Sequence, residues 1–218
     1  MLRVPSLALI GLGLALVGCS SAQKASKPTS EVTAPIQINL DLKDSSKSFG
    51  VLPLGEDRKI FKVGYGKNGV TCAGSRFEEG YTPLGTFKVN AILSKDRFEM
   101  DPALIKQSGK TQAELKKTLF QSMNSIDFSG DGEIGQYGIG YVSLAPVKSV
   151  KQPFRFNTYD GKFRWYSFAI HGSNNDARIG QKVTGGCVNV GAPILNILLR
   201  SVRLGDEVVV SANGTCTP

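Results

Sequence analysis

The stretch Ile36–Leu42 has the sequence IQINLDL, in which branched apolar residues alternate with polar ones. Because successive side chains of a β-strand point to opposite faces, this period of two predicts a strand with one buried face. Residues 48–54, 59–65 and 208–211 predict further strands. We therefore expect a mostly β fold.

The segments between these strands add turns, more strands and helices. Residues 81–89 predict a Pro-Leu-Gly turn that leads into a strand, and residues 137–144 and 163–170 predict two further strands. A helix is expected from Thr111, because TQAE fits a capping box and apolar residues follow at helical spacing. A short helix is expected at 192–200, with a proline near its start. One or two helices should thus pack against the sheets.

The composition is that of one folded domain. The chain has 218 residues, of which 41% are hydrophobic and 20% charged, and these proportions exclude a disordered chain or a coiled coil. Its 25 glycines favour a turn-rich β protein. The net charge of +8 comes from scattered Lys and Arg without an aromatic-and-basic motif. This pattern suits an anionic wall polymer or membrane surface, and we expect no binding of nucleic acid.

The amino terminus has the features of a targeting segment. Residues 7–17 are apolar but short for a membrane span, and they lead to the sequence LVGC, which ends at Cys19. This resembles a bacterial lipoprotein lipobox, which implies a signal peptide at 1–18 and a lipid on Cys19. Residues 19–35 would then be a flexible tether. An ordinary signal peptide or an uncleaved anchor are the alternatives.

Export would place the chain in an oxidising compartment, in which cysteines pair. With Cys19 lipidated and Cys187 kept as a thiol, Cys72 and Cys216 are left, and we predict a disulfide between them. Two free buried thiols are the alternative. We expect the protein on a membrane that faces the periplasm or cell wall, which is the outer membrane if the cell has two.

His171 is the single histidine of the sequence, and Cys187 follows it by sixteen positions in a glycine-rich segment. A free thiol is only about 3% ionised at pH 7, and an imidazole can take its proton and later return it. The pair can therefore support acyl transfer on a thiol nucleophile. Alternatively, each residue is simply buried: a histidine after an apolar run, and a cysteine as a small hydrophobe.

The segment at 127–134 and the two aromatic residues before His171 each allow a structural and a functional interpretation. Residues 127–134 match the first part of a calcium loop, but Gly138 stands where an EF-hand needs a bidentate Glu. A plain Asp-Gly turn is therefore favoured there. Trp165 and Tyr166 precede His171 and are expected to be core or cleft-wall aromatics rather than substrate contacts.

Three pieces of the sequence resemble the L,D-transpeptidase catalytic domain family, also called the YkuD-type domain. Residues 82–87 (TPLGTF) resemble the family's Thr-Pro-x-Gly-x-Phe segment, and residues 170–172 its Ile-His-Gly strand end. Residues 184–189 (TGGCVN) resemble its Ser/Thr-His-Gly-Cys-x-Arg/Asn box. The resemblance implies a β-sandwich-like domain at 36–212, with a cleft between sheets, an insertion at 101–138 and a tail at 213–218.

By the same resemblance, the chain is a cysteine L,D-transpeptidase that acts on peptidoglycan tetrapeptide stems and cross-links two diamino-acid residues. Cys187 would be the nucleophile and His171 the base and acid. The carbonyl of Gly172 would orient the imidazole, and the backbone N–H groups of Gly186 and Cys187 would bind the oxyanion. No cofactor or metal is implied, and a monomer is expected.

Thr184, Gly185 and Asn189 are the expected substrate contacts near the thiol, with two departures from the family. Gly185 stands where the family usually has His, and Asn189 replaces the Arg of many members. Thr184 either hydrogen-bonds near His171 or the substrate, or closes a turn on the backbone of Gly185.

Two other functions use the same residues. A hydrolase, such as an L,D-carboxypeptidase or an amidase that releases wall-bound proteins, would replace the acceptor amine by water. A non-catalytic wall-binding lipoprotein would have lost activity, and Gly185 is the feature that favours it.

Overall fold

The computed structural model describes residues 31–73, 78–122, 125–130, 135–147, 158–159, 162–163 and 168–217. The expected signal peptide, Cys19 and most of the expected tether lie outside these residues, as do Trp165 and Tyr166. Within the described part, no helix is both long and apolar enough to cross a membrane.

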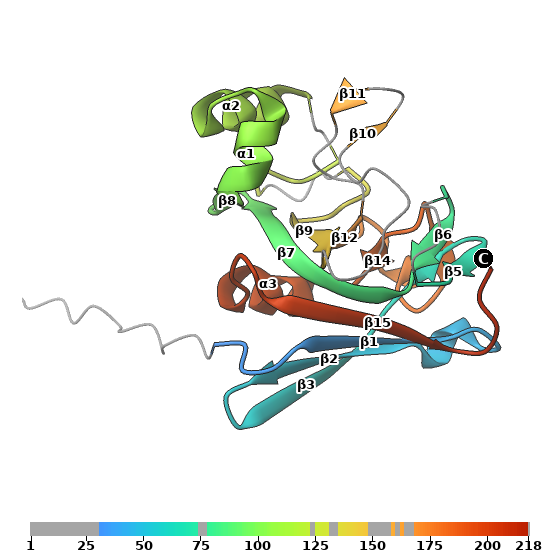
Figure 1. The fold of residues 1–218 in the computed structure, drawn as a ribbon. Coiled ribbons are helices and arrows are strands. Elements are labelled where there is room, and N and C mark those ends of the chain that lie inside the picture. The colour runs from blue at the N-terminus through green and yellow to red at the C-terminus, as the bar shows by residue number, and fades with distance from the viewer. Residues whose placement is uncertain are drawn as a thin grey trace, which may run out of the picture.

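The described residues form many short strands and three helices (Figure 1). The strands are β1 (Ile36–Asp41), β2 (Phe49–Leu54), β3 (Asp57–Lys62), β4 (Tyr65–Gly66), β5 (Gly69–Thr71), β6 (Tyr81–Pro83), β7 (Gly85–Ser94), β8 (Phe98–Met100), β9 (Gly140–Pro146), β10 (Thr158–Tyr159), β11 (Lys162–Phe163), β12 (Ala169–His171), β13 (Lys182–Thr184), β14 (Val188–Asn189) and β15 (Glu207–Asn213). The helices are α1 (Pro102–Ser108), α2 (Gln112–Ser122) and α3 (Ala192–Ser201), with 3-10 turns η1 (Ser45–Lys47) and η2 (Asp176–Arg178). The predicted mostly β fold is confirmed.

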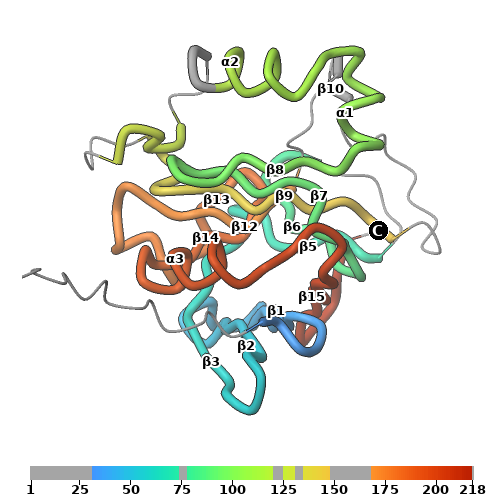
Figure 2. Tube along the Cα trace, turned by 90° about the vertical axis from the view of Figure 1, so that its left-hand side faces the viewer, coloured from blue at the N-terminus to red at the C-terminus, as the bar shows by residue number. Residues whose placement is uncertain are grey.

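One large sheet organises the described part of the chain. Its strand order is β14-β12-β9-β7-β15-β1-β2-β3, with β8 paired to β7. β1 runs parallel to β15 and β12 runs parallel to β14, whereas the other neighbours are antiparallel. In Figures 1 and 2, β1 to β3 lie at the bottom of the view, β9, β12 and β14 lie in the middle, and α1 and α2 lie at the top.

The larger core fills the side of the sheet against which α3 packs. Ile36, Ile38 and Leu40 of β1 are at most 2% exposed, as their alternation with polar residues predicts. Leu195 and Leu198 of α3 are fully buried in the same cluster. Burial of this kind stabilises by about 25 cal/mol per Å² of apolar surface, so this core is the main contribution to the stability of the domain.

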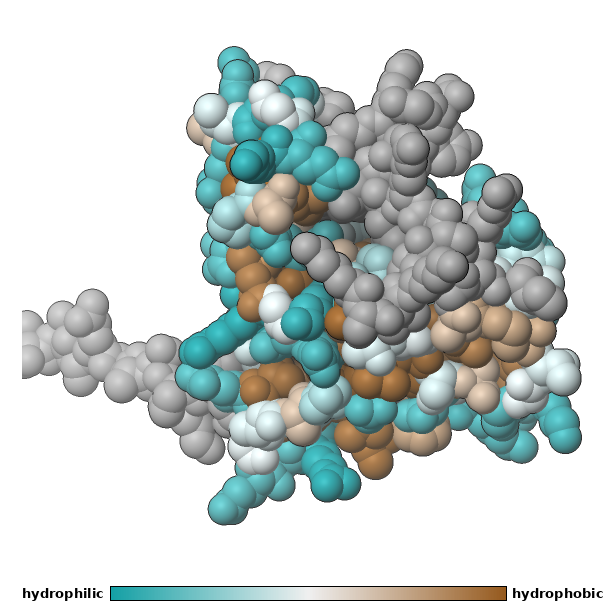
Figure 3. Space-filling model, in the orientation of Figure 1, coloured by the Kyte–Doolittle hydropathy of each residue, from teal (hydrophilic) through white to brown (hydrophobic). Residues whose placement is uncertain are grey.

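A second core lies under α1 and α2, next to β7, β8 and β9 (Figure 2). Leu104 of α1 and Leu115 and Leu119 of α2 are buried there against Leu93 of β7 and Tyr141 of β9. The outer side of this helical part is largely hydrophilic (Figure 3). The expected insertion at 101–138 therefore contributes a packed helical layer over one end of the sheet.

Local sequence explains how both helices of this layer begin. At α2, the Thr111 N–H donates to Glu114 Oε2 at 2.7 Å, and the Glu114 N–H donates to Thr111 Oγ1 at 3.2 Å. This is the reciprocal pattern of the predicted capping box. α1 adds to the expected helices: Asp101 accepts the Ala103 N–H at 2.7 Å, and a proline occupies the first turn.

The Asp-Gly segment before β9 starts as a tight turn. Asp127 Oδ1 accepts the Gly130 N–H at 2.5 Å and the Ser129 hydroxyl at 3.1 Å. This geometry agrees with the favoured turn, while the following residues 131–134 lie outside the described part.

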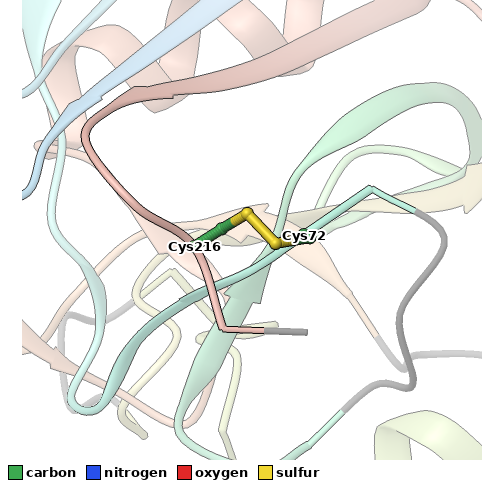
Figure 4. Close-up of a disulfide and its surroundings, with 2 residues drawn as sticks. All are labelled: Cys72 and Cys216. Carbon is green, nitrogen blue, oxygen red and sulfur yellow. A yellow bond between two sulfur atoms is a disulfide. The ribbon is translucent and has the colours of Figure 1, made fainter.

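Cys72, which follows β5, is bonded to Cys216 near the C-terminus, with 5.0 Å between the two Cα atoms (Figure 4). Backbone pairing flanks the disulfide, because the Cys72 N–H donates to Thr217 O and the Thr217 N–H donates to Val70 O. The C-terminal segment is thereby fixed to the β5–β6 ribbon. Cys187 is the one unpaired cysteine among the described residues.

Candidate active site

The strand register places the side chains of His171 and Cys187 on the same face of the sheet. Ile170 of β12 pairs with Val188 of β14, and both are buried in the larger core. Side chains alternate along a strand, so His171 and Cys187, each one position away, point to the opposite face. Tyr141 of β9, the cross-strand partner of His171, shares that face. The sixteen-residue separation of the two residues therefore closes through parallel pairing of β12 and β14.

His171 is held by its own neighbour along the chain. Its Nδ1 lies 2.6 Å from the carbonyl oxygen of Gly172, and the residue is 5% exposed. A carbonyl oxygen can only accept, so Nδ1 carries the proton and Nε2 keeps the lone pair. Burial lowers the pKa of His171 to about 4, assisted by the charge of Arg178 and opposed by the hydrogen bond to Gly172. The imidazole is therefore neutral at pH 7 and can accept a proton at Nε2.

The Cys187 thiol is half-buried at the edge of the second core. Burial raises the pKa of Cys187 to about 11, while the polar groups of Ala169 and Tyr141 near the thiol oppose that rise. At neutral pH the resting site thus holds a neutral thiol beside a neutral imidazole. Ionisation of the thiol has to accompany proton transfer to the histidine.

Two threonine hydroxyls hold the backbone on either side of the thiol. Thr82 donates to Gly186 O at 2.8 Å and accepts the Gly66 N–H at 2.9 Å. Thr184 donates to Cys187 O at 2.5 Å and accepts the Gly186 N–H at 3.2 Å. The hydroxyl of Thr184 therefore closes the turn on the backbone of Gly186 and Cys187, rather than on Gly185. Residues 185–187, which carry the thiol, are called the thiol loop below. The Thr-Pro segment that precedes β7 holds this loop through the hydroxyl of Thr82.

The two glycines before Cys187 differ in backbone conformation and in the space around them. Gly186 has a φ of 127°, a region that residues with a Cβ rarely adopt, and it is buried. Gly185 is exposed, and of the described atoms the nearest to a Cβ built on it is Glu79 Cγ at 4.0 Å. A side chain at position 185, such as the His usual in the family, therefore has room.

Asn189 is 2% exposed and faces the neighbouring backbone. Its main chain exchanges two hydrogen bonds with Gly64, each 3.0 Å long, and its Nδ2 donates to Arg178 O at 3.5 Å. A Cβ on Gly64 would lie only 2.1 Å from Asn189 Oδ1, so the two residues are in close contact. This burial favours a role for Asn189 in holding β14 against the segment before β4, rather than in touching a substrate.

Sequence reasoning did not single out the two tyrosines whose rings lie near the histidine. The ring centroid of Tyr137 lies 4.4 Å from that of His171, and the Tyr141 ring is parallel to the imidazole within 3°. Tyr137 also accepts the Gly172 N–H on its carbonyl oxygen at 2.8 Å. Both tyrosines lie in a stretch whose pattern predicts only a strand. The pairing of β9 with β12 brings Tyr141 to the site, whereas Tyr137 lies before β9 and is held there by the Gly172 N–H.

Residues 137 and 138 pack directly on the peptide that orients the imidazole. A Cβ on Gly172 would lie 2.9 Å from Tyr137 O, and one on Gly138 would lie 2.8 Å from Ser173 N. This close backbone contact explains the glycines at 138 and 172. Among the described residues, no group of three or more His, Cys, Asp or Glu side chains could hold a metal ion.

The family model of the L,D-transpeptidase catalytic domain (YkuD) matches residues 38–210. The match covers the large sheet, the thiol loop and the strand that carries His171. The chain therefore belongs to the L,D-transpeptidase catalytic domain family.

Solved structures of similar fold include L,D-transpeptidases from three organisms. The protein from Mycobacterium smegmatis shares 14% identity at a TM-score of 0.41, over 82% of this chain and 59% of that one. One from Xylanimonas cellulosilytica shares 14% at 0.39, over 85% and 65%. L,D-transpeptidase 3 from Mycobacterium tuberculosis, solved with a faropenem-derived adduct, shares 12% at 0.40, over 81% and 60%.

The chain thus spans about three fifths of the length of the solved structures that it matches. No curated protein sequence matches it.

Proposed function

We propose that this chain is a cysteine L,D-transpeptidase that acts on peptidoglycan tetrapeptide stems. The observation that carries the proposal is the hydrogen bond of 2.6 Å between His171 Nδ1 and Gly172 O. It fixes the tautomer in which Nε2 is the base, on the same face of the sheet as the Cys187 thiol. Membership of the family adds the class of substrate.

In the first half-reaction, His171 Nε2 takes the thiol proton while Cys187 Sγ attacks the carbonyl carbon at the L-centre of the diamino-acid residue. The resulting oxyanion is met by the backbone N–H of Cys187. The N–H of Gly186, bound to Thr184 Oγ1 in this structure, joins it once that bond is released. The bond to the terminal D-alanine then breaks, and His171 gives its proton to the leaving amine. A thioester on Cys187 remains.

In the second half-reaction, the amine of a second stem attacks the thioester carbonyl and loses a proton to His171 Nε2. The carbon–sulfur bond breaks, and the thiolate takes that proton back. The product is a cross-link between two diamino-acid residues. The histidine and the thiol return to their neutral resting forms.

We propose further that the protein works outside the cytoplasm, anchored by lipid on Cys19 and extended by the tether at 19–35. The net charge of +8 suits an anionic wall. Labelling of cells with an alkynyl fatty acid should mark the wild-type protein and not Cys19→Ser. Equal labelling of both would contradict the anchor.

The test of the activity is incubation of the full-length protein with muropeptides rich in tetrapeptides, followed by mass spectrometry. Cross-linked dimers that lack one D-alanine are expected, whereas Cys187→Ala and His171→Gln should form none. Uncrosslinked tripeptides as the sole product would assign hydrolysis instead. Equal activity in wild type and Cys187→Ala would rule out the thioester.

A carbapenem supplies a second readout that needs no acceptor. The wild-type protein should gain the mass of the compound at Cys187, because the thiol can open the β-lactam to an acyl-enzyme. Cys187→Ala is the matched control. An unmodified wild-type mass would contradict a functional nucleophile.

A further inference from the structure

We propose that Thr82 is a positioning residue, which directs the backbone N–H of Cys187 at the oxyanion that forms when the substrate carbonyl is attacked. The inference rests on the proposed function insofar as Cys187 is the nucleophile and its N–H an oxyanion donor. It goes further by assigning a part in the reaction to a residue outside the thiol loop, which precedes Gly186 by 104 positions in the sequence.

The hydroxyl of Thr82 is held between two backbone groups. Thr82 is fully buried, and its Oγ1 accepts the Gly66 N–H at 2.9 Å. A hydroxyl carries one proton, and this proton is donated to Gly186 O, which lies 2.8 Å from Oγ1. The strands around Thr82 are in close contact, because a Cβ built on Gly66 would lie 2.7 Å from Thr82 N. The direction of the hydroxyl is therefore fixed by the fold.

The hydrogen bond to Gly186 O also sets the direction of the next N–H group along the chain. No peptide bond in the described part of the chain is cis, so the peptide between Gly186 and Cys187 is trans. In a planar trans peptide, the C=O and the N–H point in opposite directions. Because Thr82 holds the carbonyl of Gly186, the N–H of Cys187 has to point away from Thr82.

This peptide needs a hydrogen bond to keep its orientation. Gly186 has no Cβ to restrict rotation of the peptide that follows it, and its φ of 127° already lies in a region open mainly to glycine. On the other side of the nucleophile, Thr184 donates to Cys187 O at 2.5 Å. Gly66, which donates to Thr82, is the cross-strand partner of Thr184. Two linked threonine hydroxyls therefore hold both peptide planes that flank Cys187.

The Cys187 N–H is available to a substrate. Among the described residues no oxygen accepts it, whereas the Gly186 N–H donates to Thr184 Oγ1 at 3.2 Å. The N–H and Sγ belong to one residue, so an oxyanion on the carbon bonded to Sγ lies within reach of this N–H. A donor that is directed before the reaction stabilises the new charge without a cost of reorganisation. Of the two expected oxyanion donors, the Cys187 N–H is the one already free in the resting site.

The experiment compares two reactions of the Cys187 thiol, of which only one forms an oxyanion. Acylation by a carbapenem begins with addition to a carbonyl, whereas alkylation by iodoacetamide displaces iodide from a saturated carbon. Thr82→Val keeps the shape of the side chain and removes the donor, so the limiting rate of acylation should fall about ten- to a hundredfold. The carbapenem concentration that gives half of this rate, and the rate of alkylation, should keep their wild-type values.

Two further variants serve as controls. Thr82→Ser keeps the hydroxyl and should acylate at the wild-type rate. Thr71→Val is matched to Thr82→Val, because Thr71 is a buried threonine on the strand that pairs with β6, and its Oγ1 has no hydrogen-bond partner in the described part of the chain. Both of its rates should equal those of the wild type. If Thr82→Val does not fold, Thr82→Ala takes its place with the same expected results.

Three results would contradict the role of Thr82. The first is a wild-type rate of acylation in the folded variant that lacks the hydroxyl. The second is an equal fall of acylation and alkylation, because a general loosening of the thiol loop would slow both reactions. The third is a Thr82→Ser variant as slow as Thr82→Val. A wild-type protein that the carbapenem leaves unmodified would instead overturn the proposed function, and this inference with it.

Discussion

His171 and Cys187 are both neutral in the resting site, and burial is the cause for each. Burial raises the pKa of Cys187 to about 11 and lowers that of His171 to about 4. A preformed thiolate–imidazolium pair would require the opposite shifts. In the proposed reaction, the thiolate of Cys187 is therefore formed only as the substrate reacts.

The buried histidine makes stability depend on pH. An unfolded chain binds a proton at histidine near pH 6.5, whereas His171 in the folded protein binds it only near pH 4. Between these values the unfolded state binds more protons, so the free energy of unfolding falls as the pH is lowered from 7 to 4. This group contributes up to about 3 kcal/mol to the fall.

Urea unfolding of wild type and His171→Gln at pH 7, 5 and 4 measures this contribution. The variant should lose less stability on acidification than the wild type. Carboxylates with lowered pKa values, such as Asp41 and Glu99, titrate equally in both proteins and cancel in the comparison. Parallel curves for the two proteins would show that His171 is not buried as a neutral base.

The two glycines of the thiol loop provide a matched pair of variants. Gly185→Ala should change the free energy of unfolding by less than about 0.5 kcal/mol, because its position is exposed and has open space. Gly186→Ala should cost about 1–3 kcal/mol, because a φ of 127° strains any residue with a Cβ. Thermal denaturation of both variants measures the two losses of stability. Equal losses would contradict the positive φ of Gly186.

Among the elements, α1 and α2 form the layer that covers the site side of the sheet. This layer continues into residues 135–139, where Tyr137 accepts the Gly172 N–H and packs on the imidazole. The expected insertion therefore contributes side chains to the second core and, through Tyr137, helps to hold the orientation of His171.

The start of α2 can be tested without touching the site. Thr111→Ala removes the hydroxyl that accepts the Glu114 N–H, and the free energy of unfolding should fall by about 1 kcal/mol. The rate of Cys187 alkylation should stay at the wild-type value, since the cap lies on an exposed end of the helix. A variant as stable as wild type would show that the capping box adds nothing to the folded layer.

The sequence predicts the elements better than it predicts their pairing. Alternation locates β1 and β2, and the capping box locates α2, because these signals act between neighbours along the chain. The placement of Tyr141, His171 and Cys187 on one face of the sheet depends on the register of β9, β12 and β14, which is set by long-range pairing. A single sequence without that register offers two tyrosines in a strand and no reason to choose them.

At the scale of the whole molecule, the disulfide joins residues 144 positions apart. On the chain-entropy model, closing so long a loop stabilises the folded state by up to about 5 kcal/mol, and measured gains are often smaller. The double variant Cys72→Ala/Cys216→Ala should therefore melt well below the wild type. Wild type in dithiothreitol should approach the melting temperature of the variant, and no difference between oxidised and reduced wild type would contradict a stabilising bridge.

The disulfide is also connected to the loop that carries Cys187. Cys72 directly follows β5, and β5 pairs with β6. The hydroxyl of Thr82 on β6 donates a hydrogen bond to Gly186 O. The disulfide between Cys72 and Cys216 therefore stabilises the β5–β6 ribbon, and this ribbon in turn holds the loop that carries the free thiol of Cys187. In a reducing environment the disulfide would open and the β5–β6 ribbon would hold the Cys187 loop less firmly. The same environment would protect the Cys187 thiol from oxidation.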